Sequence, residues 1–230
     1  MLIKGLQKLT LLDFPEKMAC TVFTFGCNFR CPFCHNAPLV LADRADDLTI
    51  PEDAFFAFLN GRRGILEGVC VTGGEPTLQS DLLAFLGRIR EMGFAVKLDT
   101  NGSRPAVLKA AVEAGLVDYV AMDVKNSLPR YAETVGLSAY NTAAVEESMD
   151  FLLAGHVLYE FRTTVVQGLH TPADLAAAGA RVAGAARYFL QLFEDSGDLV
   201  GSCAGAPTRA EAEAMLDALR VYVPNAQIRG

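Results

Sequence analysis

The sequence predicts an α/β fold with a mostly parallel sheet, arranged as a single barrel-like domain. Apolar runs alternate with helical patterns along the chain, which is the order of repeated strand and helix units. The 230 residues, 51% of them hydrophobic, can bury one sizeable core and match the size of a single α/β barrel. Because no internal repeat or linker divides the chain, we expect one domain over residues 1–230, with a barrel core at about 19–195.

Six apolar runs are the candidate strands, and helical patterns lie between them. The strands are expected at 19–25, 68–72, 95–99, 119–124, 159–166 and 187–193. The helices are expected at 51–59, 80–91, 105–114, 142–154 and 172–186, several of them opened by a proline or a hydroxyl residue. Thr208 and Glu211 then have the spacing of a capping box. They predict a final helix at about 208–221, with Met215, Leu216 and Leu219 on its apolar face.

Charge and hydropathy exclude two classes of partner. The formal net charge of −7 argues against nucleic acid, because phosphate binding needs a basic face. The first residues lack the apolar core and cleavage pattern of a signal peptide, and no later run approaches the ~18 apolar residues of a membrane span. We therefore expect a cytoplasmic protein with neither a nucleic-acid nor a membrane partner.

Polar residues follow successive candidate strands. They are Gly73-Gly74-Glu75-Pro76 after the second, Asp99-Thr100-Asn101-Gly102 after the third, Asp123-Val124-Lys125 after the fourth, and Arg162 within the fifth. The carboxyl ends of parallel barrel strands meet at one rim, so these residues are expected to lie together. A buried strand rarely tolerates an unpaired guanidinium, so Arg162 is expected to face a carboxylate in the barrel mouth.

Three cysteines form the most informative motif. Cys27, Cys31 and Cys34 follow the first candidate strand as C-x3-C-x2-C, with Phe33 just before the last thiol. Structural zinc normally takes four protein ligands, whereas three thiolates on one loop can hold three irons of a [4Fe-4S] cluster and leave the fourth iron open. The remaining cysteines, Cys20, Cys70 and Cys203, stand alone in the sequence and are expected to have no part in the site.

The cysteine loop and the segment that follows the second strand resemble a known family. The C-x3-C-x-aromatic-C pattern is similar to the signature of the radical S-adenosylmethionine (SAM) superfamily, in which the amine and carboxylate of SAM chelate the open iron. This resemblance implies a partial (β/α)6 TIM-like barrel. It also implies that Gly73, Gly74 and Glu75, which resemble the family's GGEP motif, receive the methionine amine of SAM.

Two further segments look like elements of a narrower group, the glycyl-radical-enzyme activating enzymes. Asp99-Thr100-Asn101-Gly102 resembles their DTNG element, and Met122-Asp123-Val124-Lys125 resembles their DLK element. The resemblance implies that Asp99 faces the ribose and methionine of SAM and that Lys125 binds its carboxylate. It further implies that His35, next to Cys34, frames the adenine, and that Asp99 and Asp123 share a monovalent cation.

The opening of the chain narrows the resemblance again. Leu12-Asp13-Phe14-Pro15-Glu16-Lys17 and the segment from Thr21 to Asn28 are similar to the start of anaerobic ribonucleoside-triphosphate reductase activating proteins. The implied reaction begins when a flavodoxin- or ferredoxin-type reductant supplies an electron to the cluster. SAM is then cleaved to methionine and a 5′-deoxyadenosyl radical, which takes a hydrogen atom from a glycine of the partner enzyme.

Two other interpretations remain open at this point. The chain could be a radical SAM enzyme that acts on a small metabolite or nucleoside precursor, since a short chain leaves part of the rim accessible. It could also be an iron- or zinc-binding module without catalytic activity. Formation of a cluster together with cleavage of SAM would exclude the non-catalytic module. If deoxyadenosine formation required a small molecule and no partner protein, the metabolite enzyme would be favoured.

Overall fold

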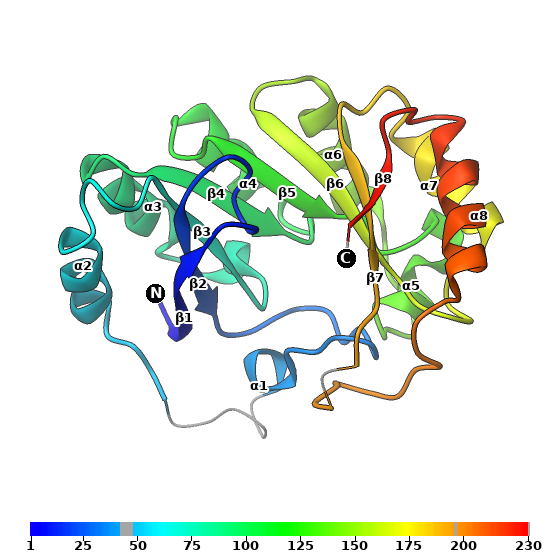
Figure 1. The fold of residues 1–230 in the computed structure, drawn as a ribbon, viewed down its shortest axis with the longest axis horizontal. Coiled ribbons are helices and arrows are strands. Elements are labelled where there is room, and N and C mark those ends of the chain that lie inside the picture. The colour runs from blue at the N-terminus through cyan, green and yellow to red at the C-terminus, as the bar shows by residue number, and fades with distance from the viewer. Residues whose placement is uncertain (42–47, 196, 230) are drawn as a thin grey trace.

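A computed structural model describes residues 1–41, 48–195 and 197–229, and within these ranges it contains one eight-stranded sheet (Figure 1). The strands lie in chain order from β1 to β8, so the sheet is open rather than closed. Strands β2 to β8 are all parallel to their neighbours, whereas β1 runs antiparallel to β2. The strands are β1 (Ile3–Thr10), β2 (Ala19–Thr24), β3 (Gly68–Gly73), β4 (Ala95–Thr100), β5 (Tyr119–Asp123), β6 (Leu158–Val165), β7 (Tyr188–Leu192) and β8 (Gln227–Arg229).

The six predicted strands correspond to β2 to β7, and the α/β barrel-like fold is confirmed. Helices cover one face of these strands and the barrel interior lies on the other, which explains their nearly continuous apolar sequence. The two outer strands were not predicted. β1 is a half-exposed edge strand with two register shifts, and β8 has three residues, so neither has a run of alternating apolar residues.

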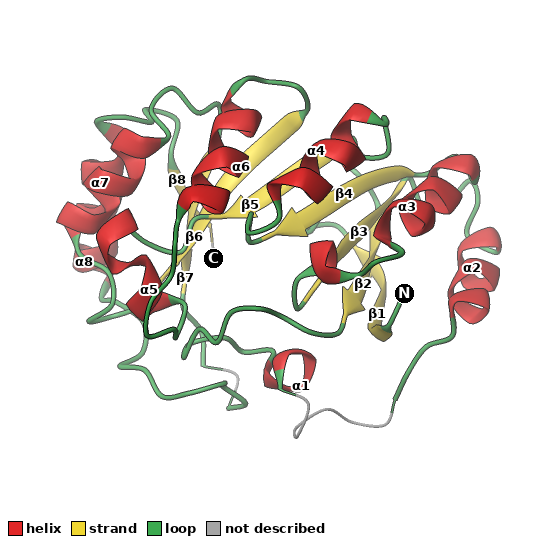
Figure 2. Cartoon of the chain, turned by 180° about the vertical axis from the view of Figure 1, so that it is seen from behind, coloured by secondary structure: helices red, strands yellow, loops and turns green. Residues whose placement is uncertain are grey.

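Helices α3, α4 and α6 lie on the outer face of the sheet (Figure 2). The helices are α1 (Ala37–Val40), α2 (Glu52–Asn60), α3 (Leu82–Glu91), α4 (Pro105–Glu113), α5 (Tyr131–Thr134), α6 (Ala143–Leu153), α7 (Pro172–Arg181) and α8 (Arg209–Arg220). The prediction for α7 was too long, since it extended to residue 186. The chain leaves the helix at Val182, with φ −117° and ψ 32°, and Gly184 follows in the left-handed region at φ +81°.

The C-terminal part contains the predicted final helix, α8, and one strand that was not predicted, β8. Helices α7 and α8 both begin with a capping box, built by Thr171 with Asp174 and by Thr208 with Glu211, as predicted for α8. They pack against each other through Gly179, where a Cβ atom would lie 2.9 Å from Cδ1 of Leu219. Strand β8 then pairs in parallel with β7 and becomes the last strand of the sheet.

The parallel strands point their carboxyl ends at the same rim, where the loop after β2 and helix α1 lie (Figure 1). The opposite end holds the β1–β2 hairpin, whose Phe14 side chain is buried against Tyr119 with ring centroids 6.3 Å apart. Among the described residues, no helix is both long and apolar enough to cross a lipid bilayer. The fold therefore gathers the predicted motifs at one end of the barrel.

Candidate active site

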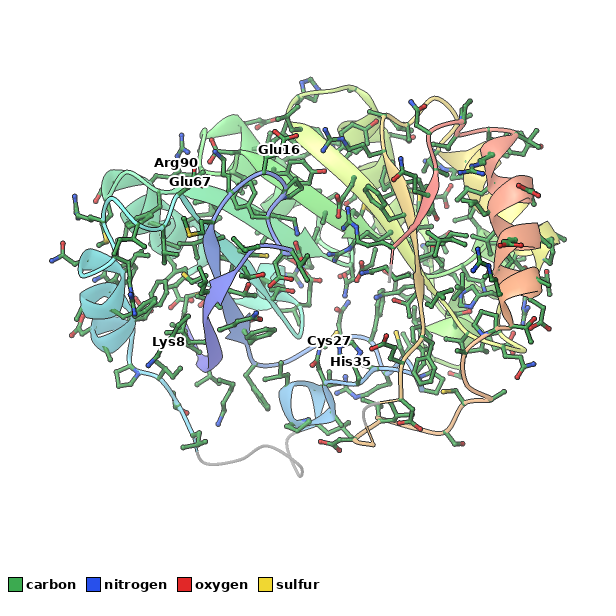
Figure 3. All side chains as sticks on the ribbon, viewed as in Figure 1. Lys8, Glu16, Cys27, His35, Glu67 and Arg90 are labelled. Carbon is green, nitrogen blue, oxygen red and sulfur yellow. The ribbon has the colours of Figure 1, made fainter. Side chains whose placement is uncertain are left out.

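The cysteine loop, residues 26–36, follows β2 at the rim of the barrel. Figure 3 shows Cys27 and His35 together at this end, far from Glu16 and Arg90 at the opposite end. The guanidinium of Arg30 donates to the carbonyl oxygens of Cys27 at 2.6 Å and Phe29 at 2.8 Å. These bonds fold the loop over its own backbone and leave the cysteine side chains facing the barrel.

A distant segment holds the same loop from the other side. The backbone N–H of Val200 donates to the carbonyl oxygen of Cys34 at 3.0 Å, and that of Gly201 donates to Pro32 at 2.9 Å. A Cβ atom at position 201 would lie 3.0 Å from the Pro32 Cβ, so glycine allows this close approach. The cysteine loop is thus fixed by residues that follow β7.

The three thiols of the loop are free and largely shielded from water. Burial raises the pKa of Cys27 to about 11 and that of Cys31 to about 12, so both are protonated at neutral pH until a metal replaces the proton. The backbone N–H of Phe29 donates to Cys27 Sγ at 3.4 Å. Among the described residues, no three His, Cys, Asp or Glu side chains are grouped tightly enough to hold a single metal ion.

Gly73 and Gly74 bring the end of β3 against the start of the cysteine loop. Gly73 has φ +118°, and a Cβ atom there would overlap the backbone of Thr24. A Cβ atom on Gly74 would overlap the carbonyl oxygen of Gly26, which instead accepts a 2.7 Å hydrogen bond from the Glu75 N–H. Only glycine fits at either position, because the two loops touch through their backbones.

Glu75 is buried beneath this contact and is surrounded by hydrogen-bond donors. Its Oε1 accepts from the backbone and hydroxyl of Thr77 and, at 2.7 Å, from the hydroxyl of Thr100. Its Oε2 accepts from the backbone N–H of Asn101 at 2.7 Å. Burial raises the pKa of Glu75, although these bonds oppose the shift. The side chain therefore joins the ends of β3 and β4.

Asn101 joins the end of β4 to the cysteine loop. Its Oδ1 accepts from the Ser103 N–H at 2.9 Å, which turns its Nδ2 toward Asn28 Oδ1, 3.0 Å away. Asn28 in turn donates to the Ser103 hydroxyl at 2.9 Å and closes a ring of hydrogen bonds. The same Nδ2 lies 3.9 Å from Cys27 Sγ. Asn101 is thus held beside the first thiol.

Five charged side chains form a row of alternating sign across the barrel interior. From β4 to the loop after β5, the row runs Lys97, Asp99, Arg162, Asp123, Lys125. Arg162 donates to Asp99 Oδ2 at 3.0 Å and to Asp123 Oδ1 at 3.0 Å, as expected for a guanidinium on a buried strand. Lys125 Nζ donates to Asp123 Oδ2 at 2.9 Å, and Lys97 pairs with Asp99 at the other end.

The row fixes the charge state of its members. Burial alone would raise the pKa of Asp123, but Arg162 and Lys125 hold it far below its usual range. Burial alone would lower the pKa of Lys125, but the charge of Asp123 raises it above its usual range. Asp123 and Lys125 are therefore both charged at neutral pH. Counted by formal charge, the row has three cationic side chains against two carboxylates, which leaves one surplus positive charge.

Every candidate site residue predicted from the sequence lines one cavity of about 290 Å³ at this rim. The cavity wall combines Cys27, Cys31, Phe33, Cys34, His35, Gly73, Gly74, Glu75, Asp99, Asn101, Asp123, Lys125 and Arg162. Gln7, Asp13 and Thr21 also line it, near the outer edge of the sheet. The expectation that successive strand ends share one rim is therefore met.

Sequence reasoning missed two residues that organise this site. Lys97 lies in the middle of the apolar run of β4, and the argument applied to Arg162 would have found it. His170 is buried, and its ring lies against that of Phe33 in the cysteine loop, with ring centroids 6.3 Å apart. Its Nδ1 accepts from the Val166 N–H at 3.1 Å, so its Nε2 carries the proton that bonds the Lys125 carbonyl oxygen at 2.8 Å. Only the fold reveals that contact.

Comparison with protein families matches residues 21–168 to the family described as the Radical SAM superfamily. This range runs from within β2 to the loop after β6 and contains all the candidate site residues predicted from the sequence. The chain belongs to the radical SAM superfamily. It is therefore an enzyme of this superfamily, and the matched range contains the three-cysteine loop.

Similar proteins and structures agree with this membership. A Methanocaldococcus jannaschii protein provisionally named a glycyl-radical enzyme activating enzyme is 31% identical over 99% of this chain and 95% of its own length. A protein of Thermococcus kodakarensis named a probable GTP 3′,8-cyclase is 31% identical over 64% of this chain and 47% of its own. The crystal structure of Streptococcus suis SuiB bound to SAM has a TM-score of 0.70 at 13% identity, covering 90% of this chain and 49% of SuiB. The chain thus spans about half the length of these last two, and the SuiB likeness supports the radical SAM fold alone.

Proposed function

We propose that this radical SAM enzyme generates a glycyl radical on a partner enzyme, and that the partner is an anaerobic ribonucleoside-triphosphate reductase. The observation that supports SAM chemistry is the convergence of three thiols and a surplus positive charge on one cavity. The observation that supports a glycyl-radical partner is similarity to the named activating enzyme along almost the whole of both chains.

The three cysteines fit a [4Fe-4S] cluster by their chemistry. Cys27, Cys31 and Cys34 would each hold one iron, and their facing the same cavity leaves a fourth iron toward the remaining side chains. When bound, the reduced cluster supplies one electron that cleaves SAM to methionine and a 5′-deoxyadenosyl radical, which takes a hydrogen atom from the substrate. The electron would come from a flavodoxin- or ferredoxin-type protein.

The other cavity residues would orient SAM. Lys125 ends the charge row with the surplus positive charge, so it would meet the methionine carboxylate. The backbone at Gly73 and Gly74 would meet the amine, and Glu75 would act mainly by holding that loop, because its oxygens already bond protein donors.

The remaining side of the cavity would receive the nucleoside. Asp99 and Asn101 would face the ribose, and Phe33 and His35 the adenine. A monovalent cation at Asp99 and Asp123 is not part of the proposal, since three cationic side chains already neutralise both carboxylates.

The proposal is tested by electron paramagnetic resonance. The reconstituted holoenzyme, a chemical reductant and SAM are incubated without oxygen with an anaerobic ribonucleoside-triphosphate reductase from the same source. A glycyl-radical signal in the reductase is expected with the wild type and with Cys203→Ala, and none with Cys31→Ala. Deoxyadenosine formed without any reductase radical, and only when a small metabolite is added, would instead support a metabolite-modifying enzyme.

A further inference from the structure

Lys97 occupies an unusual position in the middle of the barrel. It shares the inner face of β4 with Asp99, and its side chain is 2% exposed. Its ammonium contacts Asp99 Oδ1 and lies 3.8 Å from Cys70 Sγ on the neighbouring strand. Because burying an ammonium group costs several kcal/mol and a buried pair rarely repays that cost, stability alone does not explain a lysine here.

The charge row supplies a different reason for the lysine. With Lys97, the row holds three cations and two carboxylates, and the surplus charge is available at Lys125. Without Lys97, the row would be neutral. Asp99 Oδ1 would then keep its contact with the Cys70 thiol, 3.6 Å away. Of the two cations that now pair with Asp99, Arg162 alone would remain.

Arg162 carries this effect along the row because it contacts both carboxylates. A guanidinium drawn toward Asp99 would leave Asp123 more dependent on Lys125. Lys125 would then be held more tightly by its own carboxylate and would be less free to bind an external anion. The contacts therefore connect the inner end of the row to its outer end through four consecutive ion pairs.

We propose that Lys97 is a positioning residue for SAM, which fixes Asp99 and keeps Lys125 available to the SAM carboxylate through the shared contacts of Arg162. This inference rests on the proposed function, since it assumes that SAM occupies the cavity. Lys97 itself lies below Asp99 on the same strand and touches no part of SAM in this proposal.

The test measures the SAM dissociation constant of the reconstituted holoenzyme by equilibrium dialysis, together with its iron and sulfide content. Lys97→Met is expected to raise the dissociation constant about tenfold while iron and sulfide stay at the wild-type level. Lys97→Gln keeps a hydrogen-bond donor but removes the charge, and it is expected to raise the dissociation constant by the same factor. This variant provides the test if Lys97→Met does not fold. Lys109→Met is the matched control, because it removes a lysine from a surface pair with Glu147.

A double-mutant cycle separates positioning from a general effect on the fold. If Lys97 acts through Asp99, adding Lys97→Met to Asp99→Asn should change the dissociation constant less than twofold. If the double variant instead raised the dissociation constant by the product of the two single effects, the inference would be wrong. An unchanged constant in both Lys97 variants, with a raised constant in Lys125→Met, would overturn it and leave the proposed function standing. If the wild-type holoenzyme does not bind SAM, both the inference and the proposed function are wrong.

Discussion

Two carboxyl groups in one cavity have opposite pKa shifts because their partners differ. Glu75 is bonded by neutral donors, so burial dominates and its pKa is raised. Asp123 is bonded by two cations, which overcome burial and lower its pKa. At the scale of single residues, this site is therefore built on charge pairing on the Lys125 side and on neutral hydrogen bonding on the Glu75 side.

Glu75→Gln tests the neutral side. An amide in place of the carboxylate turns an NH₂ group toward backbone donors, either Thr77 N–H or Asn101 N–H. We expect SAM affinity to fall about tenfold, because losing one charge-assisted hydrogen bond to Glu75 would loosen the loop that meets SAM. We also expect the thermal midpoint to fall by several degrees. Dialysis and differential scanning calorimetry measure both, with Glu147→Gln on the exposed face of α6 as control. Unchanged affinity and midpoint would remove Glu75 from the site.

The sequence predicted which residues lie together better than it predicted their contacts. Cysteine spacing and strand-end position were sufficient to place all candidates on one cavity, because parallel strands end on one side. Spacing carries no information on which oxygen of Glu75 is already bonded, or on the contact of Asp99 and Asp123 with the same Arg162 guanidinium. Those contacts depend on side-chain directions that only the packed barrel fixes.

At the scale of elements, the site depends on two loops that touch through glycine backbones. Gly74→Ala would place a methyl group on the Gly26 carbonyl oxygen and push the cysteine loop away from β3. We expect reconstituted iron to fall at least about twofold, because the thiols would no longer face one cavity. Gly87→Ala is the matched control. Gly87 lies within α3, and its Cβ would come no closer than 3.9 Å to the Leu116 side chain, so cluster content should stay at the wild-type level. Full iron content in Gly74→Ala would contradict this account of the loop.

Helix α7 offers a test of pH dependence at its first turn. Burial alone would raise the pKa of Asp174, but hydrogen bonds from Thr171, Ser127 and Arg130 lower it. A lowered folded-state pKa contributes stability that is complete above the ordinary value of about 3.9 and is lost as pH falls through the folded value. We therefore expect Asp174→Asn to lower the free energy of unfolding by about 1 kcal/mol at pH 7 and by progressively less below pH 4.

Urea unfolding at pH 7 and at pH 3 measures this difference. The exposed pair of Arg209 and Glu213 on α8 provides the control, since Glu213→Gln should cause no comparable change at either pH. An Asp174→Asn cost that is equal at both pH values would show that the carboxylate charge does not stabilise the start of α7.

Sequence periodicity predicted the elements whose burial is strong. β2, β3 and β5 are buried along nearly their whole length, and α8 has a capping box, so each leaves a clear pattern. Strand β1 was missed because it is an edge strand with exposed Gln7, Lys8 and Leu9. The end of α7 was missed because Ala-rich sequence continues past Arg181, while packing against α8 and a left-handed Gly184 end the helix.

At the scale of the whole molecule, the barrel is an open sheet that carries its polar residues inside. The charge row crosses the interior from β4 to the loop after β5, and the cysteine loop covers one end. Gln7 and Gln191, on strands near opposite edges of the sheet, both line the same cavity. If the substrate is a protein, as proposed, these two side chains could hydrogen-bond its backbone.

Transfer of deuterium is the measurement that tests the central claim most directly. The reductase partner is prepared with Cα-dideuterated glycine and incubated without oxygen with the reduced holoenzyme and SAM. The account predicts one deuterium in 5′-deoxyadenosine for each glycyl radical formed, with Lys125→Ala slowing both together. Deoxyadenosine that carries no deuterium from the partner, but gains it from a labelled small molecule, would contradict the claim that the substrate is a protein glycine.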